Sequence, residues 1–310
     1  MSIMENQRLM AKVCELYYLS ELSQKEVSSR LGISRPQISR IIAQARAQGM
    51  VEIHVRNPHE TDTALERQLV RRYALEDAFV VSIPEGEPEE RELAFSREAA
   101  SYLDFLLGAG VSLGVMSGKT IAGMAHQLRG GGRTLGEIVP LVGGIGPVAP
   151  DLHANTIAMT IARNLGGTPL VLNAPLVVSS PEAAALLRQE QGIARVLEKG
   201  ARCDYYLIGI GKADARSTTA QAGGLTPEDL ELLRREGACC SACNSYFDRD
   251  GREIIALRDR SIGLGLLELK KGRVIACARG TSKTEAIRAA LKTGRVHLLM
   301  TDAETARTLL

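Results

Sequence analysis

The chain has 310 residues, and its 38 basic and 36 acidic side chains leave a formal net charge of only +2. A near-neutral chain does not coat nucleic acid along its whole length, and a chain this long can bury more than one core. No run of 18 apolar residues and no signal-peptide core occurs, so a soluble, cytoplasmic protein is expected. In that compartment the six cysteines should stay as free thiols.

Two short helices are predicted near the N-terminus, one on each side of a glycine turn. Residues 23–26 (SQKE) and 34–37 (SRPQ) both fit the capping box, in which a Ser hydroxyl and a Glu or Gln side chain close the first helical turn. Gly32 suits the left-handed conformation that ends a helix, so the first helix should stop at about Leu31. Pro36 is tolerated in a first helical turn. This arrangement predicts a helix-turn-helix, whose second helix lies in the major groove of DNA.

The second of these helices has one apolar face and one polar face. Apolar residues recur at helical spacing and are expected to pack inward: Ile38, Ile41, Ile42 and Ala45. The polar face supplies the candidate DNA-contacting residues: Ser34, Arg35, Gln37, Ser39, Arg40 and Gln44. Residues 30–56 carry five arginines and one glutamate, the electrostatic footprint of a phosphate-contacting module. A three-helix interaction domain with solvated arginines is the alternative interpretation.

Residues 49–55 (GMVEIHV) begin with a helix-stopping Gly and then alternate apolar with polar residues. This pattern predicts a strand that forms the wing of a winged helix, on which His54 could contact phosphate. Pro58 then marks the domain boundary, and residues 61–73 have the pattern of an amphipathic helix that connects domains or makes a dimer contact. The predicted organisation is a winged helix-turn-helix over 1–57, a connector over 58–76, and an effector-binding and oligomerisation domain over 77–310.

From residue 78 onward, short apolar strands alternate with amphipathic helices. Strands are predicted over 79–81, 111–115, 138–142, 170–172, 205–209, 273–277 and 296–301. Helices are predicted over 89–107, 121–128, 157–164, 181–198 and 284–291. Alternation of this kind predicts a doubly wound α/β fold, with a mostly parallel sheet covered by helices on both faces. Such sheets bind ligands at the carboxyl ends of their strands.

Glycine-rich segments follow three of these strands. Residues 114–120 (GVMSGKT) open a helix, so backbone N–H groups, two hydroxyls and the helix dipole would face a bound anion. Residues 142–146 (VGGIG) and 208–212 (IGIGK) end two further strands, where glycine permits a ligand to approach the backbone closely. Taken singly, each cluster also fits a tight turn. The first is not a Walker loop, because its Gly-Lys-Thr lacks the preceding glycine at the required spacing.

Together these motifs resemble the SorC family of bacterial sugar-responsive transcription regulators. The resemblance rests on the N-terminal module, residues 114–120, Gly143 with Gly144, 204–211 (DYYLIGIG), 246–248 (YFD), 280–287 (GTSKTEAI) and 299–302 (LMTD). It implies a winged helix joined to an effector domain similar to glucosamine-6-phosphate deaminase and ribose-5-phosphate isomerase. It further implies a phosphorylated sugar or polyol as effector, no cofactor, and a dimer or tetramer on palindromic operator DNA.

The resemblance also implies which residues contact the effector. The expected contacts are the phosphate-binding loop and a set of further residues: Gly114, Ser117, Gly118, Lys119, Thr120, Gly143, Gly144, Gly209, Gly211, Ser241 and Lys283. Ser117 and Lys119 stand where the family has a large aromatic residue and a hydroxyl residue. Ser241 stands where the family has an acidic residue. The more positive site predicts an effector with more than one negative charge centre; in the alternative, Lys119 points into solvent.

Other residue types suggest alternatives to a simple regulator. Cysteines 239, 240 and 243 lie close together, but a structural zinc needs four ligands, so buried small hydrophobic residues are expected. His126 and His153 are expected to be solvated or core residues. The alternative function is a sugar-phosphate isomerase or deaminase with an appended DNA-binding domain, for which Asp248 and Asp302 are candidate bases. Both aspartates fit local roles better, in a turn and as a helix cap, so no enzymatic activity is expected.

Overall fold

The computed structural model describes residues 3–51 and 62–310. The chain divides into two compact units, Met1–Pro58 and His59–Leu310. The predicted wing strand, including His54, falls almost entirely outside the described residues. Within the part that the structure describes, no helix is both long enough and apolar enough to cross a membrane.

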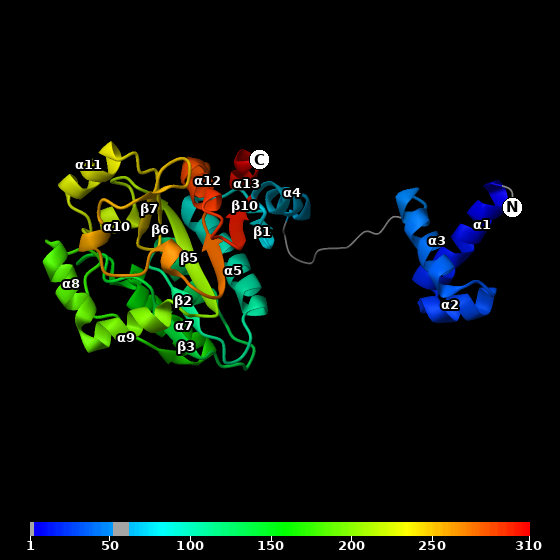
Figure 1. Cartoon of the computed structure of the whole chain (residues 1–310), viewed down its shortest axis with the longest axis horizontal. Coiled ribbons are helices and arrows are strands. Elements are labelled where there is room, and N and C mark those ends of the chain that lie inside the picture. Colours follow the sequence, from blue (N-terminus) through cyan, green and yellow to red (C-terminus); the bar gives the residue numbers. More distant parts are fainter. Residues whose placement is uncertain (1–2, 52–61) are drawn as a thin grey trace. The chain divides into compact units, whose positions relative to one another are not determined.

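The N-terminal unit packs three helices around a small core (Figure 1). α1 (Ile3–Cys14) continues into a π-helical turn (Glu15–Leu19) and is followed by α2 (Gln24–Leu31) and α3 (Arg35–Ala47). The buried core residues are Met10, Val13, Cys14, Leu16, Val27, Ile38, Ile41, Ile42 and Ala45. All four apolar residues predicted to face inward on α3 are in this core, which confirms its packing face.

The helix starts in this unit differ from each other. At α2 the Ser23 hydroxyl accepts from the Glu26 N–H at 3.3 Å, and the Glu26 carboxylate accepts from the Ser23 N–H at 2.8 Å. Gly32 ends α2 with a φ of 67°, as predicted. The capping box predicted at the start of α3 is wrong. Ser34 makes no side-chain capping bond, because the Gln37 N–H that its hydroxyl would bind donates to the Ser34 backbone carbonyl at 2.9 Å.

The C-terminal unit is built on parallel strands in the order β1-β10-β9-β5-β2-β3-β4. Their bounds are β1 (Asp77–Val81), β2 (Leu113–Val115), β3 (Glu137–Pro140), β4 (Thr168–Pro169), β5 (Tyr205–Lys212), β9 (Arg273–Cys277) and β10 (Leu298–Asp302). Alternate residues of one strand enter different cores: Tyr206 and Ile208 pack on one face of the sheet and Leu207 on the other. Strands buried on both faces characterise a doubly wound sheet, so the predicted fold class is confirmed.

Helices cover both faces of this sheet. One face packs against α5 (Pro88–Leu106), α6 (Lys119–Gln127) and α7 (Ala154–Leu165). The other packs against α4 (Thr63–Tyr73), α8 (Pro181–Gln189), α9 (Gln191–Gly200), α12 (Thr284–Lys292) and α13 (Ala303–Leu309). Short 3-10 turns occur at Pro150–Leu152, Arg258–Arg260, Leu266–Glu268 and Thr281–Lys283. Leu65 and Leu69 of α4 are buried, as the amphipathic pattern predicted.

Several short elements depart from the prediction. β6 (Cys240–Ala242), β7 (Ser245–Phe247) and β8 (Glu253–Ile254) form an antiparallel extension from the end of β5, and α10 (Thr218–Gln221) and α11 (Pro227–Arg235) precede it. Strands of two or three residues are too short to show a period of two in sequence. The helix predicted over 181–198 is two helices, because Glu190 leaves the helical conformation between them, with a φ of −58° and a ψ of 126°. The strand predicted over 170–172 is wrong, since β4 ends at Pro169.

Candidate functional site

α3 presents the predicted reading face to solvent. All six polar residues are exposed: Ser34, Arg35, Gln37, Ser39, Arg40 and Gln44. Ile38 and Ile42, on the opposite side, are buried. Arg46 is exposed as well, but its Nε donates to the Tyr18 hydroxyl at 2.6 Å and its guanidinium lies over the Tyr18 ring. This contact holds the last turn of α3 against the preceding π-helical turn.

The anion-binding segment predicted after β2 has the geometry expected of a helix start. Gly118 precedes α6 with a φ of 140°, a conformation that side-chain-bearing residues rarely adopt, and its N–H donates to the Leu152 carbonyl at 3.0 Å. Gly118, at the N-cap position of α6, has no side chain that could cap the helix. The N–H groups of its first turn therefore have no acceptor within the helix and can bind an anion. Ser117, the residue before Gly118, is only 4% exposed.

A cavity of about 70 Å³ lies beside this segment, at the carboxyl ends of β2, β5 and β9. The structure brings the following predicted effector residues together around it: Ser117, Gly118, Lys119, Thr120, Gly209, Gly211, Ser241 and Lys283. Ser217, Thr218 and Thr219 also line it and were not predicted; their only signal in the sequence is a run of hydroxyl residues. No carboxylate lines the cavity within the described part of the chain.

Three predicted glycines do not line this cavity. A Cβ on Gly114 would lie 2.8 Å from the Leu141 and Tyr206 side chains. A Cβ on Gly143 would lie 2.5 Å from the Pro175 carbonyl oxygen. The N–H of Gly144 donates to the Ala174 carbonyl at 2.8 Å. These three glycines therefore allow neighbouring chain segments to pack closely and do not contact a ligand in the cavity.

Lys283 is the half-buried cation of the cavity. It lies on the turn Thr281–Lys283, and its ammonium group forms no hydrogen bond or ion pair with the residues that the structure describes. Burial lowers the pKa of Lys283; the Glu92 carboxylate opposes this effect, and the Arg279 guanidinium adds to it. Glu92 and Arg279 pair with each other, with the Arg279 Nε 3.0 Å from Glu92 Oε2. A partly buried ammonium without a partner is suited to bind an anion.

Residues 57–310 match the family model of the sugar-binding domain, and residues 9–48 match that of sigma-70 region 4. The chain is 29% identical over 307 residues to the deoxyribonucleoside regulator of Bacillus subtilis, with 98% of each chain covered. The structure of the full-length sorbitol operon regulator SorC of Klebsiella pneumoniae matches with a TM-score of 0.73 and 25% identity, over 98% of this chain and 99% of that chain. The chain belongs to the SorC family of sugar-binding transcriptional regulators.

Two further matches support the same family assignment. A DeoR family transcriptional regulator from Listeria monocytogenes is 30% identical, with a TM-score of 0.74 over 80% of this chain and 99% of that chain. The sorbitol operon regulator of Klebsiella pneumoniae is 27% identical over 98% of both chains. These proteins are transcriptional regulators and not enzymes, so the chain is a DNA-binding transcriptional regulator.

The two aspartates considered as catalytic bases have structural roles in the regulator. Asp302 Oδ1 accepts from the Thr305 N–H at 2.7 Å and so caps α13, as predicted. Asp248 Oδ1 accepts from the N–H groups of Asp250 and Arg252 at 2.8 and 2.9 Å, which confirms the predicted turn. These backbone bonds, the Arg252 bond most, lower the pKa of Asp248. A carboxylate engaged in this way is a poor general base.

The cysteines have the burial expected of small hydrophobic residues. Cys240 and Cys243 are buried, and Cys239 is half-buried. Burial raises the pKa of Cys243 to about 12, so its thiol stays protonated at neutral pH. Among the described residues, no group of three or more His, Cys, Asp or Glu side chains could hold a metal ion. His126 is exposed on α6, and His153 is half-buried at the start of α7.

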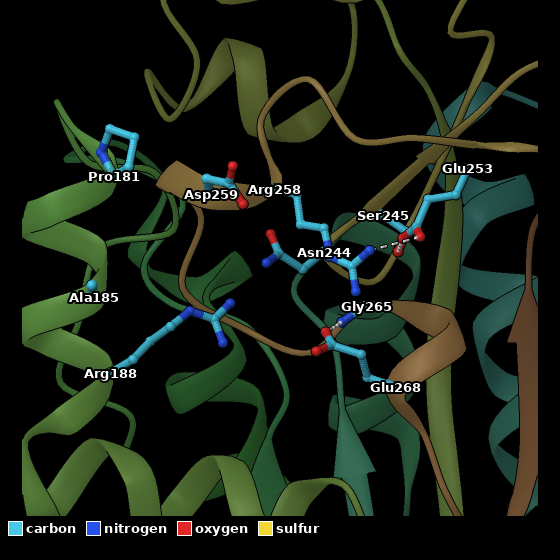
Figure 2. A pocket seen from close by; sticks show the side chains of 10 residues that line it. All are labelled: Pro181, Ala185, Arg188, Asn244, Ser245, Glu253, Arg258, Asp259, Gly265 and Glu268. Carbon is cyan, nitrogen blue, oxygen red and sulfur yellow. Dashed lines mark hydrogen bonds and ion pairs between the residues drawn. The ribbon is translucent and has the colours of Figure 1, made fainter.

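A separate cavity of about 390 Å³ lies between α8 and the turns that follow β8 (Figure 2). It is larger than the cavity beside α6, but charged side chains that line it already form hydrogen bonds with backbone groups of the chain. The Arg188 guanidinium donates to the Ser261 and Gly263 carbonyls at 2.9 and 3.1 Å. The Glu268 carboxylate accepts from the Gly265 N–H at 2.7 Å. In the cavity beside α6, the ammonium groups of Lys119 and Lys283 form no such bond with the described residues, so this cavity is the better candidate effector site.

Proposed function

We propose that the regulator binds operator DNA through α3 and that a phosphorylated effector in the cavity beside α6 controls this binding. Ser117 carries the proposal: it is 4% exposed, lines the cavity and forms no hydrogen bond with any residue that the structure describes. Because Ser117 lines the cavity, its hydroxyl can donate to or accept from a ligand bound there. The uncapped first turn of α6 adds N–H donors and the positive end of a helix dipole. A phosphate group provides acceptors for all of these donors.

The charge of the cavity supports an effector with a second negative centre. Lys119 is exposed at the cavity, whereas Lys283 is half-buried and has no counter-charge among the side chains that line it. Ser241 carries no charge that would repel a second anion. A neutral sugar would leave both ammonium groups without a charged partner, whereas a bisphosphate or a phosphorylated sugar acid would engage both.

Calorimetric titration of the full chain tests this proposal. The probes are fructose 1,6-bisphosphate, 6-phosphogluconate, glucose 6-phosphate and glucose. The first two should bind most tightly and glucose most weakly. Lys119→Thr should weaken the doubly anionic probes by about 1 to 3 kcal/mol through loss of a charge-assisted bond, whereas the exposed Lys270→Thr, away from the cavity, is the matched control. Tight binding of glucose, or no binding of any phosphorylated probe, contradicts the proposal.

We also propose that the regulator acts as a homo-oligomer in the cytoplasm. One helix-turn-helix makes few base contacts, so specificity needs two half-sites about one helical turn, or a multiple of it, apart. In this proposal residues 1–57 bind DNA, 58–76 connect, and 77–310 bind the effector and self-associate. Light scattering at micromolar concentration, with and without operator DNA, tests the assembly. A monomer under both conditions contradicts it.

A further inference from the structure

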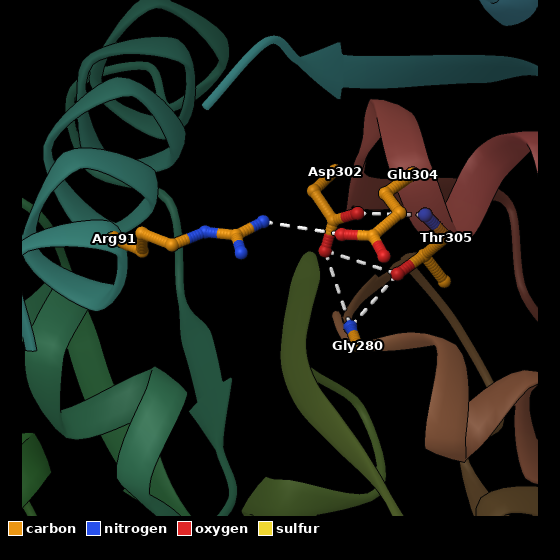
Figure 3. A network of polar contacts seen from close by, with 5 residues as sticks. All are labelled: Arg91, Gly280, Asp302, Glu304 and Thr305. Atoms are coloured by element: carbon orange, nitrogen blue, oxygen red, sulfur yellow. Dashed lines mark hydrogen bonds and ion pairs between the residues drawn. The ribbon is translucent and has the colours of Figure 1, made fainter. Parts of the chain in front are cut away.

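The turn that carries Lys283 is tied to the beginning of the last helix. Gly280 precedes this turn with a φ of 95°, and its N–H donates both to Thr305 Oγ1 at 2.8 Å and to Asp302 Oδ2 at 3.1 Å (Figure 3). The Lys283 N–H donates in turn to the Gly280 carbonyl at 2.9 Å. The position of Lys283 at the cavity therefore depends on Gly280 and its two acceptors.

Asp302 and Thr305 also form the start of α13. Asp302 Oδ1 accepts from the Thr305 N–H, and the Thr305 hydroxyl donates to Asp302 Oδ2 at 3.0 Å. Both side chains are almost fully buried, at 3% and 0% exposure. Buried polar groups that lose a partner are strongly destabilised, so this network favours a fixed arrangement of its members. The Lys283 turn and the first turn of α13 are thus expected to move together.

α13 is joined in turn to α4, the first helix of the C-terminal unit. The Tyr73 hydroxyl, at the end of α4, donates to the Leu309 carbonyl at 2.7 Å. Arg307 pairs at 3.8 Å with Asp62, the residue that caps the start of α4. Figure 1 shows the two helices beside each other at the β1 edge of the sheet. Because α4 is the element that follows the N-terminal unit along the chain, it leads toward the DNA-binding module.

We propose that Asp302 and Thr305 are positioning residues that relay occupancy of the effector cavity to α4. The proposal rests on the proposed function, because the effector must contact Lys283. An anion that displaces Lys283 shifts Gly280, and Gly280 shifts the start of α13 through its two acceptors. α13 spans only Ala303–Leu309 and is tightly packed, so a shift at its start is passed to its contacts with α4.

The test compares effector binding with the operator response in the full-length protein. The probe is fructose 1,6-bisphosphate or 6-phosphogluconate, whichever binds the parent more tightly. The response is the ratio of operator Kd values, for a site selected from a random DNA library, with and without the probe. Tyr73→Phe removes the hydrogen bond from the end of α4 to Leu309 of α13, keeps the Arg307–Asp62 pair and leaves the cavity untouched. It should keep the probe Kd within about two-fold of the parent and reduce the response roughly three- to ten-fold, the effect of one hydrogen bond.

Thr305→Val tests the other end of the relay. It removes the hydroxyl that accepts from Gly280 and keeps a side chain of similar shape, so the response should again fall roughly three- to ten-fold. Thr305→Ser should restore the response. Thr160→Val is the matched control, because that buried hydroxyl donates to the Thr156 carbonyl within α7, at 2.9 Å. If Tyr73→Phe and Thr305→Val both keep the parent's response, the relay is wrong although the proposed function stands.

A measurement without ligand separates the two proposals. Hydrogen exchange at the Gly280 amide should be faster in Thr305→Val than in the parent and in Thr305→Ser, because one of its two acceptors is lost. If no probe changes the operator affinity of the parent, the proposed function fails. The exchange experiment then decides the positioning role alone, and unchanged protection over residues 280–283 overturns it.

Discussion

The two binding surfaces of this regulator are constructed in opposite ways. The α3 surface is one exposed helix face, and its polar residues come from one short segment, 34–44, backed by a buried stripe of the same helix. The effector cavity is concave and draws on separate segments, 116–121, 209–211 and 217–219, together with Ser241 and Lys283. The surfaces share no residue and belong to different compact units. Substitutions should therefore separate DNA binding from effector binding, and the predictions below test that separation.

The largest effect is expected for the core of the N-terminal unit. Ile38 is fully buried, so Ile38→Ala should destabilise this small unit by about 2 to 5 kcal/mol. Operator binding should be lost at physiological temperature, while calorimetric affinity for an anionic effector stays at the parent value. Ile255→Ala, at a side chain that is 64% exposed, is the control and should change stability by less than about 0.5 kcal/mol. An unchanged unfolding transition in Ile38→Ala would contradict the assigned core.

Substitution of Lys283 should have the opposite effect: it should weaken effector binding and leave DNA binding unchanged. Lys283→Met should weaken binding of an anionic effector by about 1.5 to 3 kcal/mol, because a hydrogen bond to a charged group is lost. Operator binding without effector should not change. The exposed Lys270→Met is the matched control. Equal effector affinity for Lys283→Met and the parent in calorimetry would remove Lys283 from the binding site.

Single substitutions on the polar face of α3 should each weaken DNA binding. Gln37→Ala and Arg40→Ala should each weaken operator binding by about 1 to 3 kcal/mol, the value of a good bidentate contact to a base. Effector affinity should stay unchanged in both. Arg195→Ala, an exposed arginine on α9, serves as the control in the same gel-shift titrations. If both α3 variants match the parent at physiological salt, α3 is not the reading helix.

The smallest expected effect is a pH dependence that has opposite signs for stability and for binding. Because burial lowers the pKa of Lys283, the unfolded chain binds more protons than the folded chain between that lowered pKa and the ordinary lysine value. The free energy of unfolding without effector should therefore rise with pH across this window. An anionic effector binds the charged ammonium, so its affinity should fall as pH rises through the lowered pKa.

Denaturant unfolding and calorimetry over roughly pH 7 to 10 measure both trends. In Lys283→Arg the arginine side chain stays charged throughout this pH range, so the pH dependence of stability and of effector affinity should become weaker. An effector affinity that falls equally in the parent and in Lys283→Arg would assign the pH dependence to another group.

Much of the fold could be predicted because its signals act over a few residues. The Ser23 capping box, Gly32 and the apolar stripe of α3 set the helix-turn-helix locally. Buried strands that alternate with amphipathic helices leave few arrangements other than a doubly wound sheet. The short antiparallel strands after β5 gave no such signal, because Cys240–Ala242 and Ser245–Phe247 are too short for a visible period and become strands by pairing with each other and with β5.

The candidate effector site could likewise be predicted only in part from the sequence. The sequence by itself determined that glycine-rich strand ends would meet at one edge of the sheet, and that a helix start after Ser117 could bind an anion. Only the tertiary structure decided which of these glycines face the cavity: Gly209 and Gly211 line it, whereas Gly143 packs against Pro175. The physical reason is that a glycine permits close approach by either a ligand or another segment of the chain. Residues far away in the sequence determine whether a ligand or another chain segment approaches a given glycine.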